Sequence, residues 1–245
     1  MIAIETPHPG LVVSEVLGGS TRDIEDMIAV HLELFGKFEA YVPYMRERAL
    51  QPPNADPGCI YHWWLARIAD EPAAVRYFKY IPARHVGLSL GVAVRKKFRP
   101  LTFGEQYGRF SNMMILTSLK QVQADAEAMG NPVPLGIAAE VEEYLRPRYA
   151  EYNFIEYAVD YQEPSSTPDA TAASGEGEQD EQLSFRPIQI GLFKLENTAF
   201  DPYSRETQEN IVKAFLIDHY ELPVEHWAVQ QALRSIQDWP EAGEI

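Results

Sequence analysis

The stretch that decides the fold is Val86-Gly-Leu-Ser-Leu-Gly-Val-Ala-Val94. Large apolar residues alternate in it with small ones, and a β-strand sends successive side chains to opposite faces of its sheet. The pattern therefore predicts a strand with one bulky face that belongs to the core. The other face carries Gly87, Ser89, Gly91 and Ala93 and is nearly bare. We expect another group to lie close to the strand backbone on that face.

A basic segment follows this strand at once. Its cationic residues are Arg95, Lys96, Lys97 and Arg99. The next residues favour a helix start, because Thr102 is a suitable N-cap and Glu105 stands at the capping-box position. A helix N-terminus offers free N–H groups and the positive end of a dipole. Together these features predict a phosphate site. The alternatives are that the small-residue face of the strand packs under a helix and that the basic segment is a solvated turn.

The chain as a whole is acidic. Its 245 residues carry a formal net charge of −15, with a pI near 4.8. The hydrophobic fraction of 46% is enough for a core in one large domain or two small ones. Such a negative charge argues against nucleic acid or an anionic membrane as a general partner, and we expect neither.

The cysteine and histidine pattern excludes several kinds of site. The single cysteine, Cys59, allows no internal disulfide and fits a cytoplasmic protein. The six histidines are scattered without a zinc-ligand spacing, so we expect no metal site. The first residues lack a basic segment and carry Glu5 and Pro7, so we expect no signal peptide. No apolar run is long enough to span a bilayer.

The rest of the chain predicts a mixed order of strands and helices. The predicted elements are a strand at 11–17, helices after Ser20 and at 41–50, strands at 61–68, 73–80 and 86–94, a long helix ending at Gly130, a strand at 134–142, a short helix at 144–153, strands at 154–161 and 183–195, and helices at 204–220 and from Pro223. A long helix between two strands is the usual sign of a parallel pair. The segment 163–182 contains no Lys or Arg and little apolar surface, and we expect a disordered hairpin loop there.

This order resembles that of the GCN5-related N-acetyltransferase (GNAT) family over roughly residues 11–195. Arg99-Pro-Leu-Thr-Phe-Gly104 is similar to the family's pyrophosphate turn at its first and last residues, with Thr102 in place of the first glycine. Tyr149-Ala-Glu-Tyr-Asn-Phe154 is similar to the family's signature of Tyr, three residues and Gly-Phe. Asn153 stands there for glycine, and asparagine tolerates the left-handed conformation best.

The resemblance implies an α/β fold with a central mixed, mostly antiparallel sheet flanked by helices and a parallel, splayed strand pair in its middle. In the family, the pantetheine arm of acetyl-CoA enters this gap and bonds to the central strand like an added strand. The resemblance thus implies acetyl transfer from acetyl-CoA directly to an amine, with no metal. The implied cofactor-binding residues are Val92, Ala93 and Val94 of the strand and Arg99, Pro100, Leu101, Thr102, Phe103, Gly104 and Glu105 of the turn.

Three residues are candidates for proton transfer. Tyr149 matches the family's proton donor to the CoA thiolate, and its alternative role is packing against the sheet. Glu140 and Glu142 end a strand that would border the acceptor site, so either could be the base; solvated strand ends are the alternative. Glu142 also occupies the place, seven residues before Tyr149, where many family members carry asparagine.

We expect residues 1–200 to form the acetyltransferase domain. Residues 201–245 would form a helical extension that packs on this domain or makes a homodimer surface. A catalytically degenerate protein of the same fold, acting as a CoA-binding or protein-interaction module, is the alternative. A nucleotide-binding α/β domain is disfavoured because no GxGxxG or Walker turn follows a strand. The sequence leaves the acceptor open among small amines, antibiotics, polyamines and protein N-termini.

Overall fold

The structure is a computed structural model, and it describes residues 8–149, 152–165 and 183–236. The chain divides into two compact units. The first comprises Met1–Ile137 with Leu195–Ala199, and the second comprises Ala138–Lys194 with Phe200–Ile245. Among the described residues, no helix combines the length and the apolar character that crossing a membrane requires.

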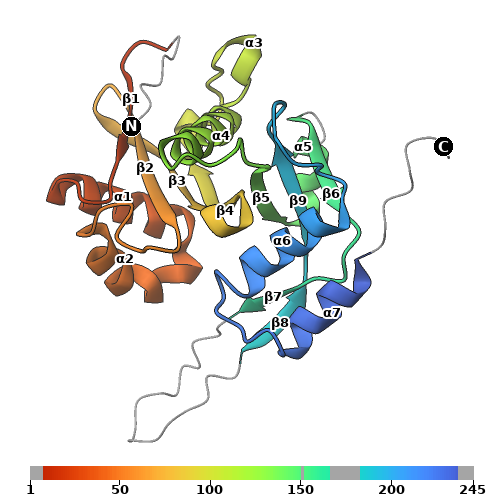
Figure 1. The fold of residues 1–245 in the computed structure, drawn as a ribbon. Coiled ribbons are helices and arrows are strands. Elements are labelled where there is room, and N and C mark those ends of the chain that lie inside the picture. The colour runs from red at the N-terminus through yellow and green to blue at the C-terminus, as the bar shows by residue number, and fades with distance from the viewer. Residues whose placement is uncertain (1–7, 150–151, 166–182, 237–245) are drawn as a thin grey trace, which may run out of the picture. The chain divides into compact units, whose positions relative to one another are not determined.

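The first unit is built on four antiparallel strands that neighbour each other in chain order (Figure 1). They are β1 (Leu11–Glu15), β2 (Ile60–Ile68), β3 (Glu71–Ile81) and β4 (Val86–Val94). Strands β2 and β3 form a hairpin, with Ile60 opposite Tyr80. Its turn residues, Ala69 and Asp70, have φ values of 48° and 68°. Two successive positive φ values fit the right-handed twist of the flanking strands.

Strand β5 (Gly136–Val141) begins in the first unit. The N–H of Leu135, just before β5, donates to the carbonyl oxygen of His85, just before β4, at 2.8 Å. The two strands therefore start side by side and in parallel at this end. The long helix α4 (Phe110–Ala128) connects them, as the sequence predicts for a parallel pair.

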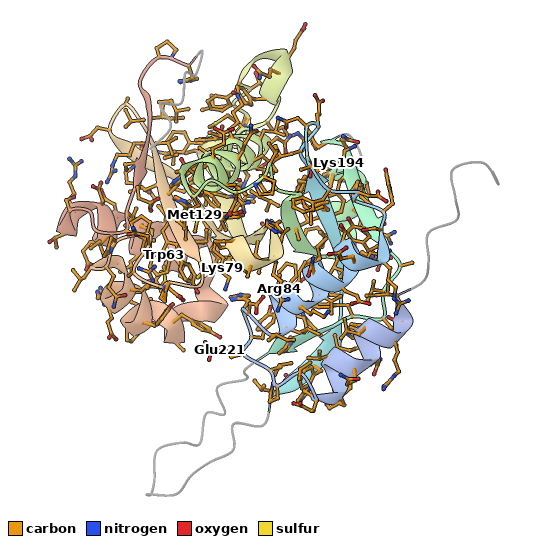
Figure 2. The ribbon with its side chains drawn as sticks, in the orientation of Figure 1. Trp63, Lys79, Arg84, Met129, Lys194 and Glu221 are labelled. Carbon is orange, nitrogen blue, oxygen red and sulfur yellow. The ribbon has the colours of Figure 1, made fainter. Side chains whose placement is uncertain are left out.

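Helices cover both faces of the β1–β4 sheet. Helices α1 (Thr21–Leu34), η1 (Gly36–Tyr41) and α2 (Val42–Ala49) belong to one side. There Trp63 of β2, labelled in Figure 2, packs in a core with Met27 and Met45. Alternate strand residues meet α4 on the other side, where His62 contacts Asp125 at 2.9 Å. Strand alternation thus separates two layers of core. The short elements of this unit are η2 (Pro82–Arg84), η3 (Lys96–Phe98) and α3 (Gly104–Tyr107).

The predicted ends of two helices are confirmed. The Ser20 hydroxyl accepts a hydrogen bond from the N–H of Asp23 at 3.1 Å and caps α1. Gly130, two residues after the end of α4, has a φ of 71°, which is the left-handed conformation that glycine adopts freely.

The second unit contains the rest of β5, then β9 (Gln189–Lys194), then β6 (Phe154–Tyr157) as hydrogen-bonded neighbours. Strands β6 and β9 are antiparallel, with Phe154 opposite Phe193. A separate two-stranded sheet pairs β7 (Gln162–Ser165) with β8 (Ser184–Pro187). Its helical elements are η4 (Glu143–Leu145), α5 (Arg146–Tyr149), α6 (Arg205–Leu216) and α7 (Trp227–Ser235). Both C-terminal helices contribute to the core of this unit, since Phe215 and Val229 are fully buried.

The expected fold class is confirmed: the sheet is mostly antiparallel, contains one parallel pair and is flanked by helices. Two strand predictions are wrong: the strand predicted at 154–161 ends at Tyr157, and the one predicted at 183–195 divides into β8 and β9. Tight turns end the first strand early, since the N–H of Val159 donates to Tyr157 O and the N–H of Tyr161 donates to Val159 O, both at 2.9 Å. Pro187, which has no N–H for a ladder, ends β8 before β9 begins.

Two further expectations need correction or lie outside the described residues. The last helix begins at Trp227 with His226 as its N-cap, and not at Pro223, because the His226 ring accepts a hydrogen bond from the N–H of Ala228. Residues 163–165 of the expected disordered loop belong to β7. Residues 166–182 lie outside the described residues.

Candidate functional site

Strand β4 contains a β-bulge that the sequence does not predict. In its register with β3, Tyr77 lies opposite Gly91 and Phe78 lies opposite Ser89, so Leu90 has no partner in β3. A bulge inserts one residue into one strand and interrupts the ladder there. The strict alternation of Val86–Val94 therefore breaks at Leu90, the middle residue of the strand.

The bulge places the small residues of β4 on two faces, and the prediction of one bare face is wrong. A Cβ on Gly87 would lie 2.9 Å from side-chain atoms of Val122 and Ile137, so the chain itself fills that position. Gly91 lies on the other side, where a Cβ would lie 3.4 Å from the Tyr77 ring. The close approach that these glycines permit is made by the protein's own side chains.

A buried arginine joins both flanks of the bulge. Arg76 is fully buried, and its Nη1 donates to Ser89 Oγ at 2.7 Å and to Gly91 O at 3.3 Å. Its Nε and Nη2 donate to Ser118 Oγ of α4 at 3.2 and 3.1 Å. Arg76 thus links β3, the bulge and α4. Sequence reasoning missed both Leu90 and Arg76, and a glycine inside a strand was the available signal for a bulge.

The predicted backbone residues of β4 lie beyond the bulge. Val92, Ala93 and Val94 pair with Arg76, Val75 and Ala74 of β3. The carbonyl of Val94 also accepts a hydrogen bond from Arg99 Nε at 2.9 Å. The guanidinium of the predicted turn is therefore anchored to the end of the strand.

The basic turn after β4 is partly neutralised by acidic residues. Arg95 Nε lies 2.9 Å from Glu33 Oε2, and Lys97 forms an ion pair with Glu71. Lys96 and Arg99 are exposed. Two of the four cations of the turn, Arg95 and Lys97, are thus paired with carboxylates. The turn therefore offers an anion less positive charge than its sequence indicates.

The predicted helix start at Thr102 is wrong. Thr102 forms an isolated antiparallel bridge with Arg109, and the N–H of Phe103 donates to Gly108 O at 2.8 Å. The intervening α3 has four residues and no side-chain cap, so the expected capping box with Glu105 is absent. The long helix begins only at Phe110.

Glycines and an aromatic contact explain this break. Gly104 and Gly108 have φ values of 74° and 58°, which interrupt a right-handed helix. Phe103 is 1% exposed, and its ring centroid lies 4.8 Å from that of Phe110. Burying Phe103 anchors the loop against the start of α4. The turn also contains Pro100 and Glu105, which are exposed, and Leu101, which is partly buried.

In the second unit, Glu140 of β5 lies between two tyrosines. Tyr161 donates its hydroxyl to Glu140 Oε1 at 2.5 Å, and Tyr220 donates to Oε2 at 2.8 Å. Burial and the nearby Glu163 raise the pKa of Glu140 to about 8, against the lowering effect of the two phenols and Arg186. Sequence reasoning identified Glu140 but missed both tyrosines, because strand and helix periodicity do not reveal contacts between distant segments.

Glu142 is engaged in an ion pair. Its Oε1 lies 2.7 Å from Arg186 Nη2 of β8, and the same guanidinium also pairs with Glu163 of β7. The side chain of Glu142 is 38% exposed. The Glu142 carboxylate is therefore paired with a cation of the small β7–β8 sheet.

Tyr149 lies in an aromatic cluster at the end of α5. Its ring centroid is 5.0 Å from that of Phe193 and 5.5 Å from that of Phe154. Gly191 permits this packing, because a Cβ there would lie 2.4 Å from the Phe154 ring. Asn153 has a φ of 54°, which confirms the predicted left-handed conformation.

Comparisons with known proteins give structural likenesses only. No protein-family model matches the chain, and no curated protein matches its sequence. The ribosomal-protein-S18-alanine N-acetyltransferase from Escherichia coli is 12% identical, covers 78% of this chain and 99% of its own, and has a TM-score of 0.43. A GNAT family acetyltransferase from Elizabethkingia anophelis, with acetyl-CoA bound, is 12% identical, with coverages of 76% and 99% and a TM-score of 0.40.

A third likeness is the PaiA N-acetyltransferase from Thermoplasma acidophilum in complex with coenzyme A. It is 11% identical, covers 76% of this chain and 99% of its own, and has a TM-score of 0.41. At these values the likenesses carry no argument about activity. The chain is thus similar in its arrangement of elements to acetyltransferases that include a GNAT family member.

Proposed function

We propose that the chain is an acyl-CoA-dependent N-acyltransferase that moves an acetyl group from acetyl-CoA directly to an amine. The observation that carries this proposal is the bulge at Leu90, because it interrupts pairing in the strand that starts in parallel beside β5 and leads into the basic turn. Bulges are frequent next to active sites. An extended ligand can add to such a strand through main-chain hydrogen bonds.

The turn after β4 offers groups that suit a pyrophosphate. Arg99 and Lys96 are exposed cations, and a Cβ on Gly104 would meet nothing within 4 Å, so its backbone is open to a ligand. We assign cofactor binding to Val92–Val94 and to the turn 99–105. Acetyl-CoA would supply the thioester on which the acceptor acts.

Glu140 is the proposed general base. The acceptor must lose a proton from its ammonium nitrogen before it attacks, and a carboxyl with a pKa of about 8 can take that proton near neutral pH. The amine nitrogen then forms a bond to the thioester carbon, and the bond from that carbon to sulfur breaks. Glu142, the other candidate, is a weaker choice because Arg186 holds its carboxylate.

Tyr149 is the proposed proton donor to the departing thiolate. The thiolate takes the phenolic proton, and the phenolate regains one from solvent. Packing against Phe154 and Phe193 would fix the direction of the Tyr149 ring. We further propose that residues 1–200 form the transferase domain and that 201–245 are its extension.

One observation favours the alternative of a non-catalytic CoA-binding or protein-interaction module. The turn leads into the four-residue α3, and α4 begins only at Phe110. The turn therefore lacks the N-terminal dipole of a long helix. If this geometry weakens pyrophosphate binding too far for turnover, the fold would act as a CoA-binding or protein-interaction module.

Isothermal titration with acetyl-CoA tests the cofactor assignment. We expect saturable binding that Arg99→Ala weakens by about tenfold or more, since a hydrogen bond to a charged group is worth about 1.5–3 kcal/mol. Arg46→Ala is the matched control, because Arg46 is an exposed arginine of the same unit that pairs with Glu25. No binding at millimolar acetyl-CoA, or equal loss in both variants, would contradict the assignment.

Release of the CoA thiol tests turnover. Acceptors of the four classes, namely a small amine, an aminoglycoside, spermidine and a peptide with a free N-terminus, would be supplied with acetyl-CoA. We expect amine-dependent release that Glu140→Gln reduces by at least about a hundredfold, a typical contribution of a general base. Binding without release for every acceptor class would favour the non-catalytic module.

A further inference from the structure

Two tyrosines from distant parts of the chain meet at Glu140. Tyr161 lies in the connection between β6 and β7, and Tyr220 follows α6 in the C-terminal extension. Each phenol donates to a different oxygen of the carboxylate, at 2.5 Å for Tyr161 and 2.8 Å for Tyr220. A carboxylate has about four lone-pair positions, so both oxygens keep a free position for an incoming proton.

Phe215 of α6 helps to fix both tyrosines. The ring of Tyr161 packs edge-on against that of Phe215 at 6.1 Å, and the N–H of Tyr220 donates to Phe215 O at 2.9 Å. Phe215 is fully buried, and Tyr161 is 1% exposed. The chain after Tyr220 turns sharply at Glu221, whose φ is 57° (labelled in Figure 2). The two hydroxyls are thus placed by packed elements of one unit.

The charged groups around this cluster have opposing effects. Glu163 of β7 disfavours a negative charge on Glu140, while Arg186 of β8 favours it. Arg186 also pairs with Glu163 and Glu142, which spreads its charge over three carboxylates. The phenol hydrogen bonds therefore act as direct support for the ionised form of Glu140.

We propose that Tyr161 and Tyr220 are positioning residues that hold the Glu140 carboxylate in place as the base, so that the C-terminal extension forms part of the proton-transfer site. This inference rests on the proposed function for the role of Glu140. It assigns a purpose to the extension beyond packing, because Tyr220 belongs to it. Neither tyrosine touches the reacting atoms in this scheme.

The test uses the full chain with Tyr161→Phe and Tyr220→Phe. Side-chain carboxyl titration of ¹³C-labelled glutamate, with Glu140 identified by its loss in Glu140→Gln, is measured without any substrate. We expect each Phe variant to raise the Glu140 midpoint by about one pH unit, because the removed O–H supports the charged form. The acid side of the pH profile of kcat, with the fastest acceptor of the screen, should move up with it.

Tyr157→Phe is the matched control. Tyr157 is a fully buried tyrosine of the same unit whose hydroxyl donates to Pro202 O at 2.8 Å and does not bond to Glu140. We expect it to leave both the Glu140 midpoint and the pH profile of kcat unchanged. At pH 7 the kcat of the other two variants should fall about tenfold for each pH unit by which the midpoint rises, while the KM for acetyl-CoA stays within about twofold.

The outcomes separate this inference from the proposed function. An unmoved Glu140 midpoint in both Phe variants overturns the positioning role, even if the protein is an active transferase. A moved midpoint in a protein that acetylates no amine shows that the tyrosines hold the carboxyl and overturns its use as a base. In an active enzyme, a raised Glu140 midpoint with an unchanged pH profile of kcat also overturns the use of Glu140 as the base.

Discussion

At the scale of single residues, His62 shows how buried charges are balanced in the first unit. Its Nδ1 lies 2.7 Å from Glu15 Oε2, its Nε2 lies 2.9 Å from Asp125 Oδ2, and its ring stacks on Phe78 at 4.7 Å. Burial opposes the charged imidazolium. Hydrogen bonds and charges from the two carboxylates together outweigh burial and raise the pKa of His62 to about 9.

His62 predicts a pH dependence of stability. A histidine pKa raised by folding contributes stability that is complete below pH ~6.5 and is lost as the pH rises through about 9. This rise in pKa corresponds to roughly 3 kcal/mol in the free energy of unfolding. We expect urea unfolding of the wild type to show this loss between pH 6 and 10.

His62→Gln separates this effect from other titrating groups. It removes the cation and leaves Glu15 and Asp125 without it, which should lower the free energy of unfolding by about 3–5 kcal/mol at pH 6. The difference in stability between wild type and variant should shrink toward pH 10. A difference that stays constant across this range would show that His62 is not charged in the folded protein.

At the scale of elements, Arg76 shapes the bulge in β4. Its guanidinium bonds to Ser89 and Gly91 on the two flanks of Leu90 and to Ser118 of α4. Ser89 and Ser118 therefore offer two similar hydroxyl partners of one cation, and only Ser89 lies at the bulge. Comparing variants of these two serines therefore distinguishes an effect on the shape of β4 from an effect on global stability.

Amide hydrogen exchange of the unliganded protein tests the bulge. We expect Ser89→Ala to speed exchange at Leu90 and Gly91 by about tenfold or more, because a hydrogen bond to a charged group contributes about 1.5–3 kcal/mol. Ser118→Ala should lower global stability by a similar amount and leave the local exchange of Leu90 unchanged relative to its neighbours. Equal local exchange in both variants would show that Arg76 does not hold the bulge.

At the scale of the whole molecule, charge decides which partners are excluded. The net charge of −15 repels polyanions, and the basic turn is partly neutralised by Glu33 and Glu71. We expect no change in the fluorescence anisotropy of a labelled DNA duplex at 50 mM salt up to about 100 µM protein, since typical non-specific binding is tighter than that. Binding that weakens steeply with salt would contradict this expectation.

Much of the local structure follows from the sequence alone. Ser20 with Asp23 marks the start of α1, Gly130 follows the end of α4, and Asn153 takes the left-handed conformation. These features depend on a few neighbouring residues and on backbone sterics, and both are local properties of the sequence. The order of elements along the chain and the parallel start of β4 and β5 follow from the same patterns together with connection lengths.

Only the tertiary structure decided the features on which the proposals rest. Whether Leu90 pairs with β3 depends on the register of two strands and on Arg76 between them, so the alternation within β4 could not reveal it. Glu140 meets Tyr161 and Tyr220 across 21 and 80 residues of chain, and no periodicity spans such separations. Local propensity fixes elements, whereas packing of distant side chains fixes which of their polar groups come together.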